Sequence, residues 1–262
     1  MTESPPLAPS PLDPASRDAL AELLLSVADD EFVIGFWDSE WTGIAPMLEE
    51  DVATSSIAQD EIGHAKALYE MLAELTGNDA DAIAYGRDAD AFRHAALLNH
   101  ARGDWAFSAA RRYLYETADA VRLEALARSS DPSLAALAGK MRREETYHML
   151  HADAWLRRLS EGDGEGRDRF SAALVSLWAD AQEVFAPLAA EEELVRSGLL
   201  TEPMRAMHAA WQTQVRPILE PICGELPRHT PSLDGRTRRT DDFRWLHAEF
   251  TSVHRSEAGA QW

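Results

Sequence analysis

The feature that most constrains the fold of this chain is a helical hydrophobic periodicity that begins near residue 18 and continues to about residue 254. Apolar residues recur at three- and four-residue steps, and residues at these steps share one face of an α-helix. The first such stripe consists of Leu20, Leu24, Val27, Ile34 and Trp41. No alternating run is bounded by the Asn-Gly or Asp-Gly turn of a β-hairpin. The sequence therefore predicts an all-α fold.

Glycine and proline divide this periodic region into separate helices. Gly43 to Pro46 interrupts the first helix, Gly77 is a plausible terminator of the second, and Ser129 to Pro132 separates the third from the fourth. The predicted helices lie at about 18–42, 46–75, 90–127 (with a break near 102–104), 134–159, 168–197, 202–226 and 241–254. Four long helices in two hairpins, joined by a polar crossover at 79–90, predict a four-helix bundle with additional C-terminal helices packed outside it.

The predicted organisation has three parts. Residues 1–16 are rich in proline and form a flexible leader, residues 17–226 form the helical bundle with two extra helices, and residues 227–262 form a C-terminal connection and short helix. The leader has neither the basic start nor the apolar stretch of a secretory signal. A single cysteine, Cys223, cannot form an internal disulfide. We therefore expect a cytoplasmic protein.

Charge and hydropathy exclude two classes of partner. The chain has 45 acidic and 25 basic residues, so its formal charge is −20, which would repel the phosphates of a nucleic acid. No apolar run approaches the roughly 18 residues that a membrane-spanning helix needs. The sequence thus predicts binding to neither nucleic acid nor membrane.

Two segments in the predicted helices have the pattern Glu-x-x-His, namely Glu61 with His64 and Glu145 with His148. Residues three apart share a helix face, so each pair directs one carboxylate and one imidazole to a common point. The pattern alone is weak, because an acidic chain contains it by chance. Its position in the predicted hairpins is more informative.

In the second hairpin the register places a further glutamate opposite Glu145. The turn is centred near Asp131, and Glu145 lies 14 residues beyond it. An antiparallel helix puts its facing residue a similar distance before the turn, and Glu116 lies there in an apolar and aromatic stretch.

The same count in the first hairpin leads from Glu61 to residues 29–31. Glu31 lies between Val27 and Ile34 on the apolar stripe and has the longest side chain of the three acidic residues. Asp30 remains an alternative, because a second stripe of similar quality runs through it.

The predicted set, with one Glu from each of two helices and Glu-x-x-His from each of the other two, is typical of carboxylate-bridged di-iron or di-manganese bundles. Four buried carboxylates would repel one another, and two divalent ions would balance their charge of −4. Oxygen ligands with two imidazoles favour iron or manganese over zinc. Asp60 and Glu144, which directly precede two of the glutamates, are expected to hydrogen-bond the outer nitrogen of the opposing histidine. The six predicted ligands are Glu31, Glu61, His64, Glu116, Glu145 and His148.

Other polar residues are expected to have ordinary roles. His151, one turn beyond His148, is expected beside the site or at the surface, and the remaining histidines lack a Glu-x-x-His partner. A cluster of five arginines is expected to be solvated, although it could bind an acidic partner or a nucleotide phosphate. These are Arg228, Arg236, Arg238, Arg239 and Arg244.

Several longer motifs carry a family resemblance. They include Glu40-Trp41, Ala45-Pro46-Met47-Leu48-Glu49, Leu123-Glu124-Ala125-Leu126, Ser129-Ser130-Asp131-Pro132, Tyr147-His148 and the closing Gly259-Ala260-Gln261-Trp262. In these motifs the chain resembles the ferritin-like subunits of phenylacetyl-CoA epoxidase, the multicomponent oxygenase of phenylacetic acid degradation, and most closely the smaller, structural subunit. The resemblance implies a ferritin-like bundle that assembles with a ferritin-like paralogue.

One motif departs from the structural subunit, which is thought to have lost most metal ligands. Here both Glu-x-x-His pairs are intact, and residues 59–64, Gln-Asp-Glu-Ile-Gly-His, are closer to Gln-Asp-Glu-Ala-Gly-His of the catalytic subunit. The resemblance then implies a di-iron oxygenase component that acts with dioxygen on a CoA thioester, with phenylacetyl-CoA as one candidate. A separate reductase would supply electrons, because no Gly-x-Gly-x-x-Gly motif follows a strand.

Two alternatives remain open from the sequence. The chain could be a non-catalytic structural subunit that stabilises a catalytic paralogue, or a stand-alone ferroxidase or peroxide-scavenging bundle. Both homo-oligomers and hetero-oligomers are compatible with the resemblance.

Overall fold

The structure is a computed structural model that describes residues 12–256. Within these residues it contains helices and no β-strand, which confirms the all-α, ferritin-like four-helix bundle. The α-helices are α1 (Pro14–Ser39), α2 (Leu48–Thr76), α3 (Ala80–Tyr85), α4 (Trp105–Leu126), α5 (Pro132–Glu161), α6 (Glu165–Ala181), α7 (Glu191–Arg196), α8 (Met204–Cys223) and α9 (Asp241–Ser256). Short 3₁₀ helices are η1 (Ala89–Ala91), η2 (Ala96–Asn99), η3 (Gln182–Phe185) and η4 (Leu233–Arg236).

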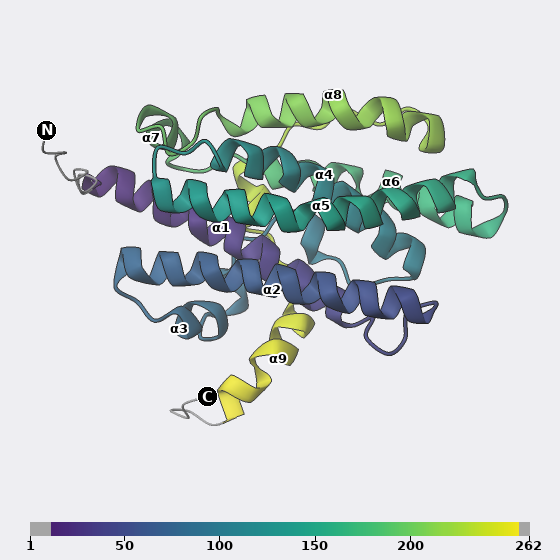
Figure 1. Ribbon diagram of the computed structural model, residues 1–262, viewed down its shortest axis with the longest axis horizontal. Coiled ribbons are helices and arrows are strands. Elements are labelled where there is room, and N and C mark those ends of the chain that lie inside the picture. Colours follow the sequence, from purple (N-terminus) through teal and green to yellow (C-terminus); the bar gives the residue numbers. More distant parts are fainter. Residues whose placement is uncertain (1–11, 257–262) are drawn as a thin grey trace, which may run out of the picture.

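The bundle consists of two hairpins, in which α1 packs along α2 and α4 packs along α5. Helices α6 and α8 pack against α4 outside the four bundle helices, while α9 contacts α1 and α3 and runs obliquely to the long axis (Figure 1). The additional C-terminal helices therefore lie where the sequence predicted them, on the outside of the bundle.

Helix ends follow local capping chemistry. The Asp13 side chain accepts hydrogen bonds from the N–H groups of Ala15 and Ser16, so α1 begins at Pro14, inside the leader predicted for residues 1–16. Residues 1–11 of that leader lie outside the described residues. Gly77 ends α2 with φ of 76°, a left-handed conformation that favours glycine.

The helix predicted at 90–127 begins only at Trp105, so its first part was wrong. The preceding segment holds η1 and η2, and two of its N–H groups donate to buried carboxylates instead of to a helical carbonyl. Arg93 N–H lies 2.6 Å from Asp29 Oδ2 and Ala95 N–H lies 2.7 Å from Asp30 Oδ1. These contacts with α1 are distant in sequence, so local periodicity did not reveal them.

The helix predicted at 168–197 is also interrupted. Helix α6 ends at Ala181, η3 follows, and α7 starts at Glu191. Pro187 lacks an N–H group and disfavours helical conformation in the residue before it; Ala186 accordingly has ψ of 132°.

Gly35 allows α1 and α2 to approach closely beside the glutamates. A β-carbon added there would lie 2.8 Å from Ile62 Cγ1, 3.1 Å from the Ala58 carbonyl oxygen and 3.1 Å from Glu61 Cβ. A larger residue at position 35 would therefore push the two helices apart where Glu31 and Glu61 meet.

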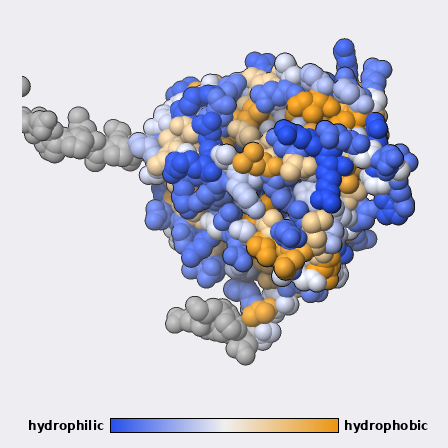
Figure 2. Space-filling model, turned by 45° about the vertical axis from the view of Figure 1, so that its right-hand side comes forward, coloured by the Kyte–Doolittle hydropathy of each residue, from blue (hydrophilic) through white to orange (hydrophobic). Residues whose placement is uncertain are grey.

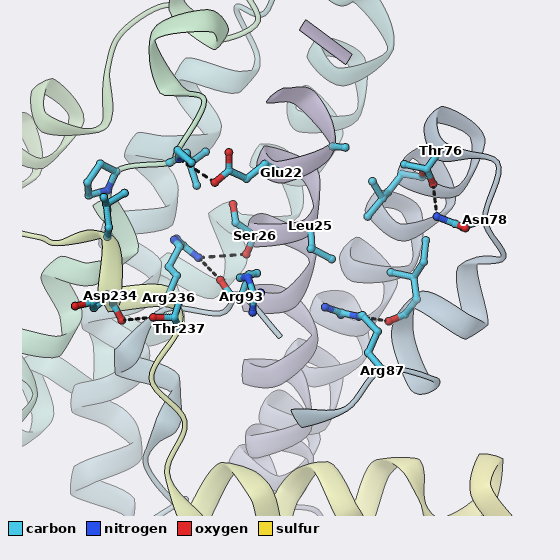
Figure 3. Close-up of a pocket in the computed structure, with 17 residues that line it drawn as sticks. Glu22, Leu25, Ser26, Thr76, Asn78, Arg87, Arg93, Asp234, Arg236 and Thr237 are labelled. Carbon is cyan, nitrogen blue, oxygen red and sulfur yellow. Dashed lines mark hydrogen bonds between the residues drawn. The ribbon is translucent and has the colours of Figure 1, made fainter. Parts of the chain in front are cut away.

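A buried ion network ties the C-terminal connection to α1. The Arg236 guanidinium lies 3.0 Å from both carboxylate oxygens of Asp30 and donates to the carbonyl of Val184. It also donates to the carbonyls of Ser26 and Arg93 (Figure 3). Arg122 of α4 contacts the same carboxylate. The expectation of one solvated arginine cluster is therefore wrong, because Arg236 is buried inside the molecule.

Hydrophilic side chains cover much of the face in Figure 2, and hydrophobic ones form separate patches between them. Among the helices of residues 12–256, none combines the length and the apolar character that crossing a membrane requires.

We predict that Arg236→Met lowers the free energy of unfolding by about 3 kcal/mol, because it removes one partner of a buried ion pair. The exposed Arg238→Met is the control and should change stability by less than about 0.5 kcal/mol. Urea unfolding followed by circular dichroism measures both. Equal effects of the two changes would contradict the network described above.

We also predict that Gly35→Ala destabilises the fold by about 2 kcal/mol through overpacking of α1 on α2. Gly63→Ala is a matched control in α2, because a β-carbon there meets nothing within 4 Å. The control should stabilise the helix by roughly 0.5–1 kcal/mol. Thermal unfolding measures the stability of both variants. If both substitutions stabilised the protein, or both destabilised it, the prediction would be refuted.

Candidate metal centre

The four bundle helices bring the six predicted ligands to one place in the core. Helix α1 supplies Glu31, α2 supplies Glu61 and His64, α4 supplies Glu116, and α5 supplies Glu145 and His148. Every one of these residues is at most 5% exposed. All four glutamates are thus removed from bulk water.

These six residues form two overlapping groups. The first contains Glu31, Glu61, His64 and Glu145, and the second contains Glu61, Glu116, Glu145 and His148. Within each group the potential ligand atoms all lie within 4.8 Å of one another. Glu61 and Glu145 belong to both groups, so the pattern is that of two adjoining ion sites with two shared carboxylates.

The histidine rings direct Nδ1 into the cluster and Nε2 away from it. His64 Nδ1 lies 3.3 Å from Glu31 Oε2 and 3.4 Å from Glu145 Oε1, and His148 Nδ1 lies 3.2 Å from Glu145 Oε2. On the outer side, His64 Nε2 lies 2.9 Å from Glu144, and His148 Nε2 lies 3.4 Å from Asp60. Each acidic residue thus contacts the histidine of the opposite helix.

Three buried oxygens of the cluster have no hydrogen-bond donor: Glu61 Oε2, Glu116 Oε2 and Glu145 Oε1. A buried unsatisfied acceptor costs about 1–3 kcal/mol, and more when it is charged. Oxygens of this kind, next to two inward-facing imidazole nitrogens, are suitable ligands for a divalent cation. The residues present therefore fit a metal ion.

The electrostatics of the cluster without metal support the same interpretation. Burial raises the pKa of Glu61 well above its usual range, and the neighbouring carboxylates of Glu145 and Glu31 raise it further. Burial and Glu145 likewise raise the pKa of Glu116 well above its usual range. The site thus favours protonation of these carboxyl groups unless a cation replaces the proton.

Asp30, the alternative to Glu31, lies in neither group. Burial acts to raise its pKa, but Arg236 and Arg122 outweigh that effect and hold the pKa below its usual value. Its neighbour Glu31 instead accepts a hydrogen bond of 2.7 Å from the Tyr115 hydroxyl through Oε1.

Two arginines at this centre were not predicted from the sequence. Arg112 contacts Glu61 and Glu116, and Arg122 lies 3.5 Å from Glu31 Oε1. Both are buried. One signal was available, since Arg112 lies four residues before Glu116 and therefore shares its helix face.

The other histidines lie outside both groups. His151 lies beside the centre, with Nε2 2.7 Å from Glu50. His94 contacts Asn99, His100 contacts Asp180, His208 contacts Gln182, His229 contacts Glu183, His247 contacts the Arg87 carbonyl, and His254 stacks on Tyr85.

Two cavities differ in their relation to the centre. A small cavity of about 20 Å³ adjoins it and is lined by Arg112, Asp38 and three tryptophans, Trp41, Trp105 and Trp155. A larger cavity of about 650 Å³ lies between α1 and the connection that holds Arg236 (Figure 3), and none of the six predicted ligands lines it.

Comparison with known proteins agrees with the resemblance. The model of the phenylacetic acid catabolic protein family matches residues 8–262. The chain is also 29% identical over 246 residues to one of the subunits of 1,2-phenylacetyl-CoA epoxidase from Escherichia coli (strain K12), an alignment that covers 93% of this chain and 99% of that protein. Since the family match extends over nearly the whole sequence, this chain belongs to the phenylacetic acid catabolic protein family.

Proposed function

We propose that the chain is a di-iron oxygenase component that acts with dioxygen on a CoA thioester resembling phenylacetyl-CoA. The observation that carries the proposal is the pair of overlapping buried groups that share Glu61 and Glu145. Manganese is the alternative metal, because the same oxygen and imidazole ligands suit both.

In this proposal Glu61 and Glu145 would be ligands shared by the two sites, and Glu31 with His64 and Glu116 with His148 would complete them. Bound iron would supply the redox chemistry for dioxygen activation. The protein contributes the rest: α1, α2, α4 and α5 fix the ligands, and burial of the centre excludes bulk water.

Asp60 and Glu144 would set the orientation of the imidazoles. Each would accept a hydrogen bond from a histidine Nε2–H, which leaves the Nδ1 lone pair directed at the centre. Because each carboxylate comes from the helix opposite its histidine, the two contacts also connect α2 to α5.

The small cavity beside Arg112 gives the centre an apolar neighbour. At about 20 Å³ it is too small for an aromatic acyl group. A substrate that approached through this wall would need side-chain movement where Trp41, Trp105 and Trp155 meet. Another cavity, of about 350 Å³, lies between α4 and α5 and is lined by Glu145 itself, so it offers a larger approach to the centre.

The relative from Escherichia coli is one subunit of an epoxidase, which implies that this chain also has partner subunits. We propose that this chain forms a hetero-oligomer with a ferritin-like paralogue and receives electrons from a separate reductase. Leu48, Val52 and Leu150 are each 64–73% exposed on α2 and α5 and are available for such contacts.

A second candidate function is that of a structural subunit without metal. Two observations favour it: the longer sequence motifs resemble those of the structural subunit, and Arg112 and Arg122 already neutralise part of the glutamate cluster. The two candidates differ in metal content, so metal analysis separates them.

We predict that the purified chain, dialysed against excess Fe²⁺ without oxygen, binds up to two iron ions. Glu61→Ala and Glu145→Ala should each abolish binding, because each residue belongs to both groups. Glu31→Ala should remove one ion although Asp30 is intact. Elemental analysis measures the content, and the exposed Glu74→Ala is the control. Undiminished iron in the Glu61 and Glu145 variants would show that the ligand assignment is wrong.

A turnover assay distinguishes a catalytic from a structural role in the assembled complex. We predict that Glu145→Ala in this chain abolishes phenylacetyl-CoA-dependent oxygen consumption when paralogue and reductase are present, because it removes a ligand shared by both ions. Formation of the oxygenated ester is followed by mass spectrometry. If the variant assembles normally and the complex keeps full activity, the chain is a structural subunit.

A further inference from the structure

The Arg112 side chain contacts the glutamates of the cluster through one nitrogen, Nη1. It lies in α4, four residues before Glu116, and is 6% exposed. Its Nη1 lies 2.5 Å from Glu61 Oε1 and also contacts Glu116 Oε1, while Nη2 pairs with Asp38 of α1. The guanidinium therefore connects the cluster to a carboxylate outside it.

The two oxygens that Arg112 contacts also lie near His148, whose nearest carboxylate oxygen is Glu145 Oε2 at 3.2 Å. His148 Nδ1 lies 3.6 Å from Glu61 Oε1 and 3.9 Å from Glu116 Oε1. A metal ion coordinated by His148 would thus compete with Arg112 for the same carboxylate oxygens.

Two of the oxygens that face His64 have no hydrogen-bond donor. His64 Nδ1 lies 3.7 Å from Glu61 Oε2 and 3.4 Å from Glu145 Oε1, and neither of these oxygens has a hydrogen-bond partner. The nearest arginine on this side, Arg122, lies 3.5 Å from Glu31 Oε1, whereas His64 faces Glu31 Oε2. A metal ion coordinated by His64 would thus gain free acceptors and displace no cation from the oxygens that face His64.

We propose, on the basis of the di-metal function above, that Arg112 is a resident cation that makes the two ion sites unequal. The site of Glu31, Glu61, His64 and Glu145 fills first. The site of Glu61, Glu116, Glu145 and His148 fills second and more weakly, because the positive guanidinium already contacts one oxygen of Glu61 and one of Glu116 and repels an incoming ion, although Glu116 Oε2 is free.

Asp38 provides a partner for the guanidinium of Arg112 when a metal ion displaces it from the glutamates. An arginine stays charged at all relevant pH values, so it must move away from an incoming cation. Asp38 already pairs with its Nη2, and the small cavity lined by Arg112, Trp41 and Trp105 adjoins it. If Nη1 leaves the two glutamates, the contact of Nη2 with Asp38 keeps the charge of the guanidinium paired inside the protein.

Stepwise Mn²⁺ binding to the purified chain tests the proposal. We expect the first ion to bind at least about tenfold more tightly than the second, the direction that Coulomb repulsion by Arg112 requires. The first equivalent should give the electron paramagnetic resonance signal of an isolated ion, and the second should replace it with that of a coupled pair. Isothermal titration calorimetry gives the two constants.

In Arg112→Gln we expect the difference between the two steps to fall to within about threefold, mainly by tighter binding of the second ion. Arg216→Gln is the control, because Arg216 of α8 is a half-buried arginine that contacts Glu220 and the carbonyls of Leu226 and Pro227 and touches neither the cluster nor Asp38. It should leave the two constants unchanged. Circular dichroism verifies that both variants are folded.

Glu116→Gln provides an independent test that does not require the arginine variant to fold. Since Glu116 belongs only to the second group, its change should remove the weak step and keep the tight one. Two equal steps in the wild type, or an unchanged difference in folded Arg112→Gln, would overturn the role of Arg112 and leave the di-metal function standing. Absence of any Mn²⁺ binding would overturn the di-metal function itself.

Discussion

The mutual repulsion of four glutamates buried at one level of the bundle is the constraint on which the rest of this structure depends. Each bundle helix contributes at least one of them, so the carboxylates cannot separate without separating the helices. Transfer of a charged carboxylate from water into a protein interior costs several kcal/mol unless a cation or hydrogen bonds compensate for it. The fold therefore requires protons, arginines or metal ions at this place, and a metal that binds only the folded chain stabilises it.

Helix α1 contains three consecutive buried acidic residues, and each points in a different direction and has different partners. Residues 26–35 are all buried, including the consecutive acidic residues Asp29, Asp30 and Glu31. Successive residues on a helix point about 100° apart. Asp29 accordingly binds Arg87 and Tyr69, Asp30 binds Arg122 and Arg236, and Glu31 faces the metal centre.

This arrangement explains what the sequence could and could not predict about the site. The bundle and the pairing of Glu116 with Glu145 follow from periodicity and hairpin register, which are local properties. The meeting of the two hairpins at Glu61 was predicted from the ligand pattern that is typical of di-metal bundles. The choice between Asp30 and Glu31 as ligand could not be made from local properties, because a helix that is buried on all sides has no exposed face to mark its orientation. Both stripes through this part of α1 are core.

The features that the sequence did not reveal depend on partners far away along the chain. Arginine is most often exposed, so buried guanidinium groups at Arg112, Arg122 and Arg236 are recognised only when the carboxylates opposite them are known. The same reason applies to the segment before Trp105, whose N–H groups bind Asp29 and Asp30 across a long separation in sequence.

The arginines also explain how closely a metal-binding and a structural subunit can resemble each other. A cluster of buried glutamates needs positive charge in either role, and a guanidinium can supply it as a metal ion can. In this chain Arg112 contacts two of the four glutamates while the oxygens facing His64 have no donor. On the proposal made above, the balance between arginine and metal at these few atoms, more than the fold, would therefore separate the two roles.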